Sequence, residues 1–254
     1  MPDTFILALI SGILVAAASG FVGSFLVLRR MTLLADALSH VALPGIALGV
    51  LLNFQPLLGG LAFLFLAVFA IWGIEHKTKL AVESITGVLF VTALAVGALL
   101  IPQSELLEAF FGSVERATPP TLLLQMLIAI AVIGLAARYL KPLVLSSIAP
   151  DLAIAAKLSY ARMELLLLIL IALTTAIGVS FMGVLLMSAL TIIPAVTARN
   201  LSRNYKVFLS LSILLAVVSL EGGLLAAQYY SLSPGIATVL IAAFFFAVSL
   251  CWKK

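Results

Sequence analysis

Residues 25–52 read FLVLRRMTLLADALSHVALPGIALGVLL. The stretch passes from one apolar run through a pair of arginines, Arg29 and Arg30, into a second apolar run. Two apolar runs joined by a short basic connection are typical of consecutive membrane-spanning helices. Because the rest of the chain repeats this pattern, the sequence predicts an all-α fold.

The composition supports the same prediction. Of the 254 residues, 64% are hydrophobic and only 9% are charged, with a mean hydropathy of +1.31, whereas a soluble domain carries about 25% charged residues. We therefore predict a polytopic transmembrane helical bundle that forms a single domain over residues 1–254. The net charge is +4, and the basic residues cluster between apolar runs. That clustering indicates membrane topology and not a nucleic-acid-binding surface.

Apolar runs of about 20 residues predict eight or nine spans. They lie near residues 4–28, 33–52, 57–74, 82–101, 120–140, 164–181, 183–198, 207–228 and 234–252. The sixth and seventh runs are nearly continuous, which leaves the number open between eight and nine. With nine spans, every basic cluster falls on one side, and the positive-inside rule makes that side the cytoplasm. The N-terminus is then outside and the C-terminus cytoplasmic. The first run lacks a basic leader, so we expect it to be retained.

Asp36 and His40 are the two candidate metal ligands within the spans. They are four residues apart, so on a helix they lie one above the other on the same face. A carboxylate and an imidazole can share a zinc, manganese or iron ion. Pro44 continues this face and has no N–H to donate to the carbonyl of His40. Two chains that each contribute this pair would supply four ligands. The alternative to metal binding is that His40 makes a structural hydrogen bond to a neighbouring helix.

Two further residues within the spans are candidates for a pathway. Pro194 interrupts the hydrogen bonding of its helix, which indicates either a broken helix beside a pathway or a packed kink. Glu221 is an intramembrane carboxylate near the outer end of its span, and such residues are commonly functional. His76, the second of two histidines, lies in a polar Glu-His-Lys-Thr-Lys stretch, and we expect it to be solvated.

Residues 141–163 form the longest segment on the predicted cytoplasmic side. Pro150 and Asp151 are typical of a helix start, and an Ala-rich turn follows. The segment is either a docking surface for another subunit or an ordinary surface loop. The chain has no GxxxxGK[ST] phosphate-binding loop, so we expect it not to hold ATP itself. Its single cysteine, Cys251, permits no intrachain disulfide.

The chain resembles the permease subunits of zinc, manganese and iron ABC importers. Five blocks carry the resemblance in order: FVGSFLVLRRMTLLADALSHVALPGIALG at 21–49, ESITGVLF at 83–90, LLEAFFGS at 106–113, MGVLLMSALTIIPAVTARNL at 182–201 and SPGIATVLIAAFFFAVSL at 233–250. Asp36 and His40 match the metal-coordinating pair of that family. The segment from Asp151 through Ala153 matches its ATPase-coupling loop, but Lys157 stands where the family has glycine.

The resemblance implies a transport subunit and not an enzyme. It implies a prokaryotic cytoplasmic (inner) membrane, a second permease chain in a homodimer, and a metal ion carried by alternating access with no permanently bound cofactor. A cytoplasmic ATP-binding cassette ATPase dimer would dock near residues 149–160, and an extracytoplasmic solute-binding protein would deliver the metal. Three rival functions remain at this point: an ion-coupled secondary metal transporter, a membrane enzyme with a single-metal site, and a purely structural membrane subunit.

Overall fold

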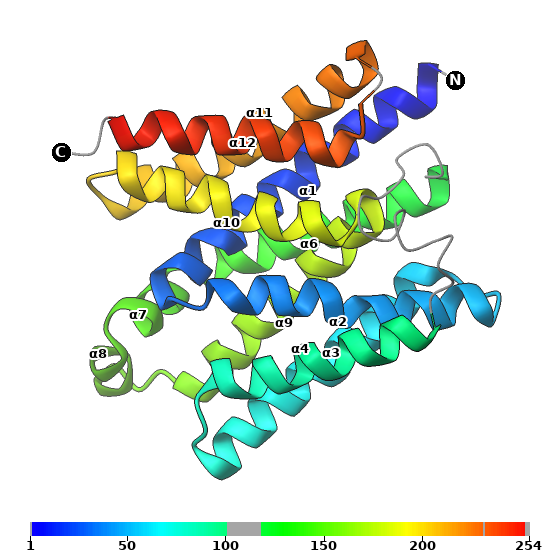
Figure 1. Cartoon of the computed structure of the whole chain (residues 1–254). Coiled ribbons are helices and arrows are strands. Elements are labelled where there is room, and N and C mark those ends of the chain that lie inside the picture. The colour runs from blue at the N-terminus through cyan, green and yellow to red at the C-terminus, as the bar shows by residue number, and fades with distance from the viewer. Residues whose placement is uncertain (1, 101–117, 231, 252–254) are drawn as a thin grey trace.

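The computed structural model describes residues 2–100, 118–230 and 232–251, and throughout these ranges the regular structure is α-helical (Figure 1). The helices are α1 (Pro2–Arg29), α2 (Thr32–Leu51), α3 (Pro56–Thr78), α4 (Val82–Leu100), α6 (Pro119–Arg138), α7 (Leu140–Ile148), α8 (Pro150–Ala155), α9 (Tyr160–Met182), α10 (Val184–Leu201), α11 (Tyr205–Tyr230) and α12 (Pro234–Cys251). The predicted all-α fold is confirmed. The block at 106–113 lies outside the described residues.

The described ranges contain nine helices that are long and apolar enough to cross a membrane, which is the larger of the two predicted numbers. The near-continuous run at 164–198 is two helices, α9 and α10, and Gly183 separates them. Gly183 has φ 84° and ψ 172°, a conformation that only glycine adopts readily. The predicted boundary between the runs at 164–181 and 183–198 is thereby confirmed, within one residue.

The helices alternate in direction, so their connections gather at two ends of the bundle (Figure 1). The connections α1–α2, α3–α4 and α10–α11 lie at one end, together with α7, α8 and the last turn of α12 (left in Figure 1). These connections carry the basic clusters of the sequence, and we call this end the basic end. One end therefore holds the basic clusters that lie within the described residues, as the nine-span arrangement predicts.

Close packing holds α2, the helix of the candidate metal ligands, against α3. Gly45 and Gly59 face each other so closely that a Cβ atom on either glycine would collide with the backbone carbonyl of the other. Small residues allow such close approach between helices in a membrane, where water supplies no driving force for their association. On its other side α2 packs on α4, where Gly97 lies against Leu43 and Pro44. These contacts fix the rotation of α2 about its axis.

Candidate metal-transport site

Asp36 and His40 lie together on α2, as their spacing predicts. His40 Nε2 is 4.0 Å from Asp36 Oδ1. The side chain of Asp36 is 44% exposed and that of His40 only 12%. The His40 ring meets the ring of Phe90 on α4 edge-to-face, with 5.1 Å between centroids and 77° between planes. The packing on Phe90 orients the imidazole, while the carboxylate of Asp36 faces an open side of the chain.

The pair lies closer to the basic end than to the opposite end. At about 1.5 Å per residue, Asp36 is about 6 Å and His40 about 12 Å from the start of α2 at Thr32. Glu221 is about 24 Å along α11 from its start at Tyr205, and α11 also starts at the basic end. Glu221 and the Asp36–His40 pair therefore occupy different depths, which argues against a single relay through all three side chains.

Glu221 packs against α1 and not against Asp36 or His40. A Cβ atom on Gly12 would lie 2.9 Å from Glu221 Oε1, so the carboxylate rests on the backbone of α1. Pro44 and Pro194 are both buried within continuous helices, α2 and α10. Pro194 therefore marks no broken helix, which favours the packed-kink alternative. A role for these three residues in a pathway stays a prediction.

The predicted helix start at Pro150 and Asp151 is confirmed. Ala149 separates α7 from α8 with φ −139° and ψ 75°, because the residue before a proline disfavours helical backbone. Asp151 is exposed in the first turn of α8, whereas Ala153 is fully buried. One face of α8 is thus packed on the bundle, and the other face is free to contact a partner.

Lys157 adopts the backbone conformation that is expected of a glycine at this position. Its φ is 58°, in the left-handed region that favours glycine. The N–H of Lys157 donates to the carbonyl of Ile154 at 2.9 Å, and that of Leu158 donates to the carbonyl of Ala153 at 3.0 Å. These bonds close the end of α8. The departure from the family pattern therefore leaves the loop with a glycine-like geometry.

Arg29 connects α7 to the transmembrane helices α1 and α9. It closes α1 and donates hydrogen bonds to the hydroxyls of Ser147 at 3.0 Å and Ser146 at 3.1 Å, both on α7. Its guanidinium also lies 5.6 Å from the centroid of the Tyr160 ring at the start of α9. One side chain thus joins α1, α7 and α9 at the basic end.

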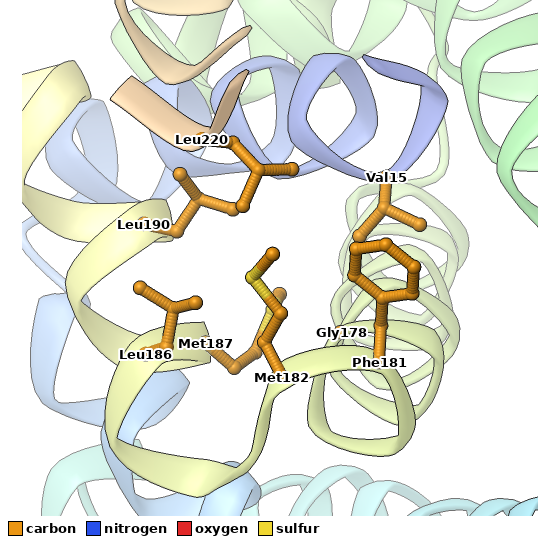
Figure 2. Close-up of a pocket in the computed structure, with 8 residues that line it drawn as sticks. All are labelled: Val15, Gly178, Phe181, Met182, Leu186, Met187, Leu190 and Leu220. Carbon is orange, nitrogen blue, oxygen red and sulfur yellow. The ribbon is translucent and has the colours of Figure 1, made fainter. Parts of the chain in front are cut away.

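A crevice between α1, α9, α10 and α11 is lined by apolar side chains (Figure 2). Its lining residues are Val15, Gly178, Phe181, Met182, Leu186, Met187, Leu190 and Leu220. Figure 2 shows these side chains facing a common space with no charged group among them. Divalent transition metals require nitrogen, oxygen or thiolate ligands. The crevice is therefore a packing space between helices and not a candidate cation site.

Sequence reasoning missed one group of titratable side chains. Glu75, His76 and Glu164 each offer one ligand atom, and these atoms all lie within 4.8 Å of one another. His76 is exposed, as the sequence predicts, but the sequence did not connect it with Glu164, which approaches from α9. The available signal was Glu164 itself, a carboxylate at the start of an apolar run. In the structure its side chain is only 3% exposed.

The fold and this arrangement of residues define a transmembrane permease subunit of an ABC transporter. The chain belongs to the ABC 3 transport family, whose family model matches residues 1–253. It is 29% identical to the high-affinity zinc uptake system membrane protein ZnuB of Haemophilus influenzae over 249 residues, covering 96% of this chain and 95% of that one. It is 30% identical to the manganese transport system membrane protein MntC of Listeria monocytogenes over 246 residues, covering 95% and 88% of the two chains.

A solved structure has the same fold. The structure of PsaBC from Streptococcus pneumoniae in complex with Fab superposes with a TM-score of 0.86 at 29% identity, covering 97% of this chain and 90% of that one. The resemblance to ABC importer permeases is thereby confirmed. The same findings favour the ABC permease over the ion-coupled secondary transporter.

Proposed function

We propose that this permease imports a divalent transition metal ion, namely zinc, manganese or iron, and that Asp36 and His40 bind the ion in transit. The carboxylate–imidazole pair on α2, 4.0 Å apart and open on the Asp36 side, is the observation that carries the proposal. Relatives named for zinc and manganese transport support the class of cargo. Zinc, manganese and iron all accept this combination of oxygen and nitrogen ligands.

The two ligands make a weak site, and a weak site suits transport. A closed cage of four protein ligands would hold the ion too tightly to release it, whereas conduction requires binding that is also easily reversed. His40 must be neutral and Asp36 ionised to bind the ion. The partly exposed face of Asp36 leaves room for the same pair from a second copy of the chain, so a homodimer would enclose the ion between two α2 helices.

The orientation of the chain in the membrane determines where the remaining partners would bind. By the positive-inside rule, the basic end with α7 and α8 would face the cytoplasm, and the C-terminus would be cytoplasmic. A cytoplasmic ATPase dimer would then dock on the exposed face of α8 around Asp151, and ATP hydrolysis takes place in that partner. A solute-binding protein would deliver the metal at the opposite end. ATP binding and hydrolysis bias alternating access through α8 and the helices that Arg29 joins to it.

The test is uptake of radiolabelled zinc and manganese by cells that express this chain with its ATPase and solute-binding protein. Wild type is compared with Asp36→Ala and His40→Ala at matched membrane abundance, with Glu83→Gln, an exposed carboxylate at the start of α4, as the control variant. We expect both alanine variants to abolish uptake of one metal, while Glu83→Gln retains it. Unchanged uptake in the alanine variants would refute the transport site. Uptake that persists without ATP and stops with an uncoupler would instead favour the ion-coupled transporter.

A further inference from the structure

Glu75, His76 and Glu164 lie at the basic end, away from the Asp36–His40 pair. The facing glycines Gly45 and Gly59 set the register of the antiparallel α2 and α3 and place Asp36 opposite about residue 68 of α3. His76 is eight residues further along α3, or about 12 Å closer to the basic end. The third member of the cluster, Glu164, comes from α9. The cluster therefore shares no ligand with the transport site.

The His76 ring is already held in the orientation of a metal ligand. Its Nδ1 lies 2.8 Å from the carbonyl oxygen of Trp72, one turn earlier on α3. Because a carbonyl only accepts, Nδ1 must carry the proton, and in the neutral ring Nε2 then presents its lone pair. Metal-binding histidines commonly make this second hydrogen bond, which fixes the tautomer and the ring. The indole of Trp72 packs on the same imidazole, with 4.7 Å between ring centroids and 38° between ring planes.

Trp72 also connects the cluster to α9. Its Nε1 donates to the carbonyl of Ala161 at 3.2 Å. The residue that orients His76 thus contacts the first turn of the helix that carries Glu164. The two sides of the cluster, α3 and α9, are held in register before any ion binds, which lowers the cost of assembling a site from separate helices.

Glu164 is the strongest sign that the cluster takes a cation. Its side chain is only 3% exposed. Within the described ranges, neither Oε2 of Glu164 nor Oε2 of Glu75 has a hydrogen-bond partner. A buried carboxylate oxygen without a partner is costly, and a second carboxylate beside it adds repulsion whenever both are ionised. The nearby cation is Arg29, whose guanidinium lies over the Tyr160 ring. Its hydrogen bonds go to Ser146 and Ser147 and not to either carboxylate.

We propose that Glu75, His76 and Glu164 form a second binding site for a divalent transition metal ion, separate from the transport pathway. Two carboxylate oxygens and one imidazole nitrogen suit manganese, iron or zinc. His76 is exposed, so the ion reaches the site from solvent and water completes its coordination. Binding adds a metal bridge between α3 and the start of α9, the helix that follows α8.

The test uses the purified full chain carrying Asp36→Ala and His40→Ala, so that the transport pair no longer binds metal. Bound Mn²⁺ is counted by electron paramagnetic resonance, and pulsed measurements detect coupling to a ligand nitrogen. We expect this parent chain to bind one Mn²⁺ with a nitrogen signal. Adding Glu164→Gln should weaken binding at least about tenfold, as loss of one ligand interaction of about 1.4 kcal/mol or more implies. Adding His76→Gln should remove the nitrogen signal.

Glu83→Gln is the matched control, because Glu83 is an exposed carboxylate at the start of α4, on the same end of the bundle. It should leave Mn²⁺ binding unchanged. The proposal is overturned if the parent chain binds no Mn²⁺, or if Glu164→Gln and His76→Gln bind as the parent does. Should Glu164→Gln fail to fold, the exposed His76→Gln still decides the matter. Because binding is counted directly, the result is independent of whether Asp36 and His40 carry the transported ion.

Discussion

His40 Nε2 lies 4.0 Å from Asp36 Oδ1 across one turn of α2. This separation is too long for a direct hydrogen bond. Bonds from zinc to imidazole nitrogen and to carboxylate oxygen are about 2.0–2.2 Å, so a single ion is able to reach both atoms. The spacing is therefore compatible with one ion bound by both side chains, as we propose.

The first prediction separates the charge of Asp36 from its shape. Asp36→Asn keeps the size of the side chain and its position on α2 but removes the negative charge that attracts a divalent ion. We expect metal uptake to fall at least about tenfold, since a lost ligand interaction worth about 1.4 kcal/mol or more gives that factor. The measurement is initial uptake rate at matched membrane abundance. Uptake at the wild-type rate would mean that the carboxylate does not bind the ion.

The second prediction concerns the close approach of α2 and α3. Gly45→Ala places a methyl group into the backbone of Gly59, and overpacking of this kind costs about 1–3 kcal/mol. We expect a lower midpoint of thermal unfolding and, because α2 carries the candidate metal ligands, reduced uptake. Gly73→Ala on α3 is the control, since a Cβ there meets nothing within 4 Å. The control should be neutral or slightly stabilising, because alanine favours helix over glycine. Equal loss in both variants would contradict the packing argument.

The third prediction tests the glycine-like turn at Lys157. A left-handed conformation costs a non-glycine residue roughly 1–2 kcal/mol, so Lys157→Gly should relieve strain, partly offset by the greater freedom of glycine in the unfolded chain. We expect an unchanged or higher unfolding midpoint with transport retained. Valine is β-branched and resists positive φ. Lys157→Val should therefore lower the unfolding midpoint and loosen the packing of α8 on the bundle. A stable and active valine variant would show that the turn does not need this backbone conformation.

Much of the fold could be predicted from the sequence because lipid imposes a simple rule. Apolar runs of span length between basic connections suffice to place the helices and to gather the basic clusters at one end. The break at Gly183 could be predicted only as one of two alternatives, because the run is nearly continuous and the positive φ that decides between eight and nine spans is not visible in the sequence. The packing of α2 against α3 was not predictable, because small residues occur in many spans and do not show which helix packs against them.

The candidate metal ligands Asp36 and His40 could be predicted because both lie on one helix, where spacing alone determines proximity. Glu75, His76 and Glu164 could not, because the sequence separates Glu164 from the other two and only the packing of α9 against α3 brings them together. Lys157 illustrates the opposite case. Its identity departs from the family pattern, yet the hydrogen bonds at the end of α8 preserve the local turn.

The last prediction concerns Arg29 as the connection between α1 and the coupling segment. Arg29→Ala removes both hydrogen bonds to α7 and the contact with Tyr160, at a cost on the order of 1 kcal/mol or more, because hydrogen bonds from charged groups are the stronger ones. We expect α7 to lose its fixed position, so that ATP hydrolysis by the partner ATPase continues while metal uptake declines. Arg162→Ala is the control, since Arg162 is exposed near the same end. Parallel measurements of ATP hydrolysis and uptake in proteoliposomes distinguish uncoupling from loss of assembly. If uptake and hydrolysis fall together in Arg29→Ala but not in Arg162→Ala, the arginine supports assembly of the complex and does not transmit motion from α7 to α1.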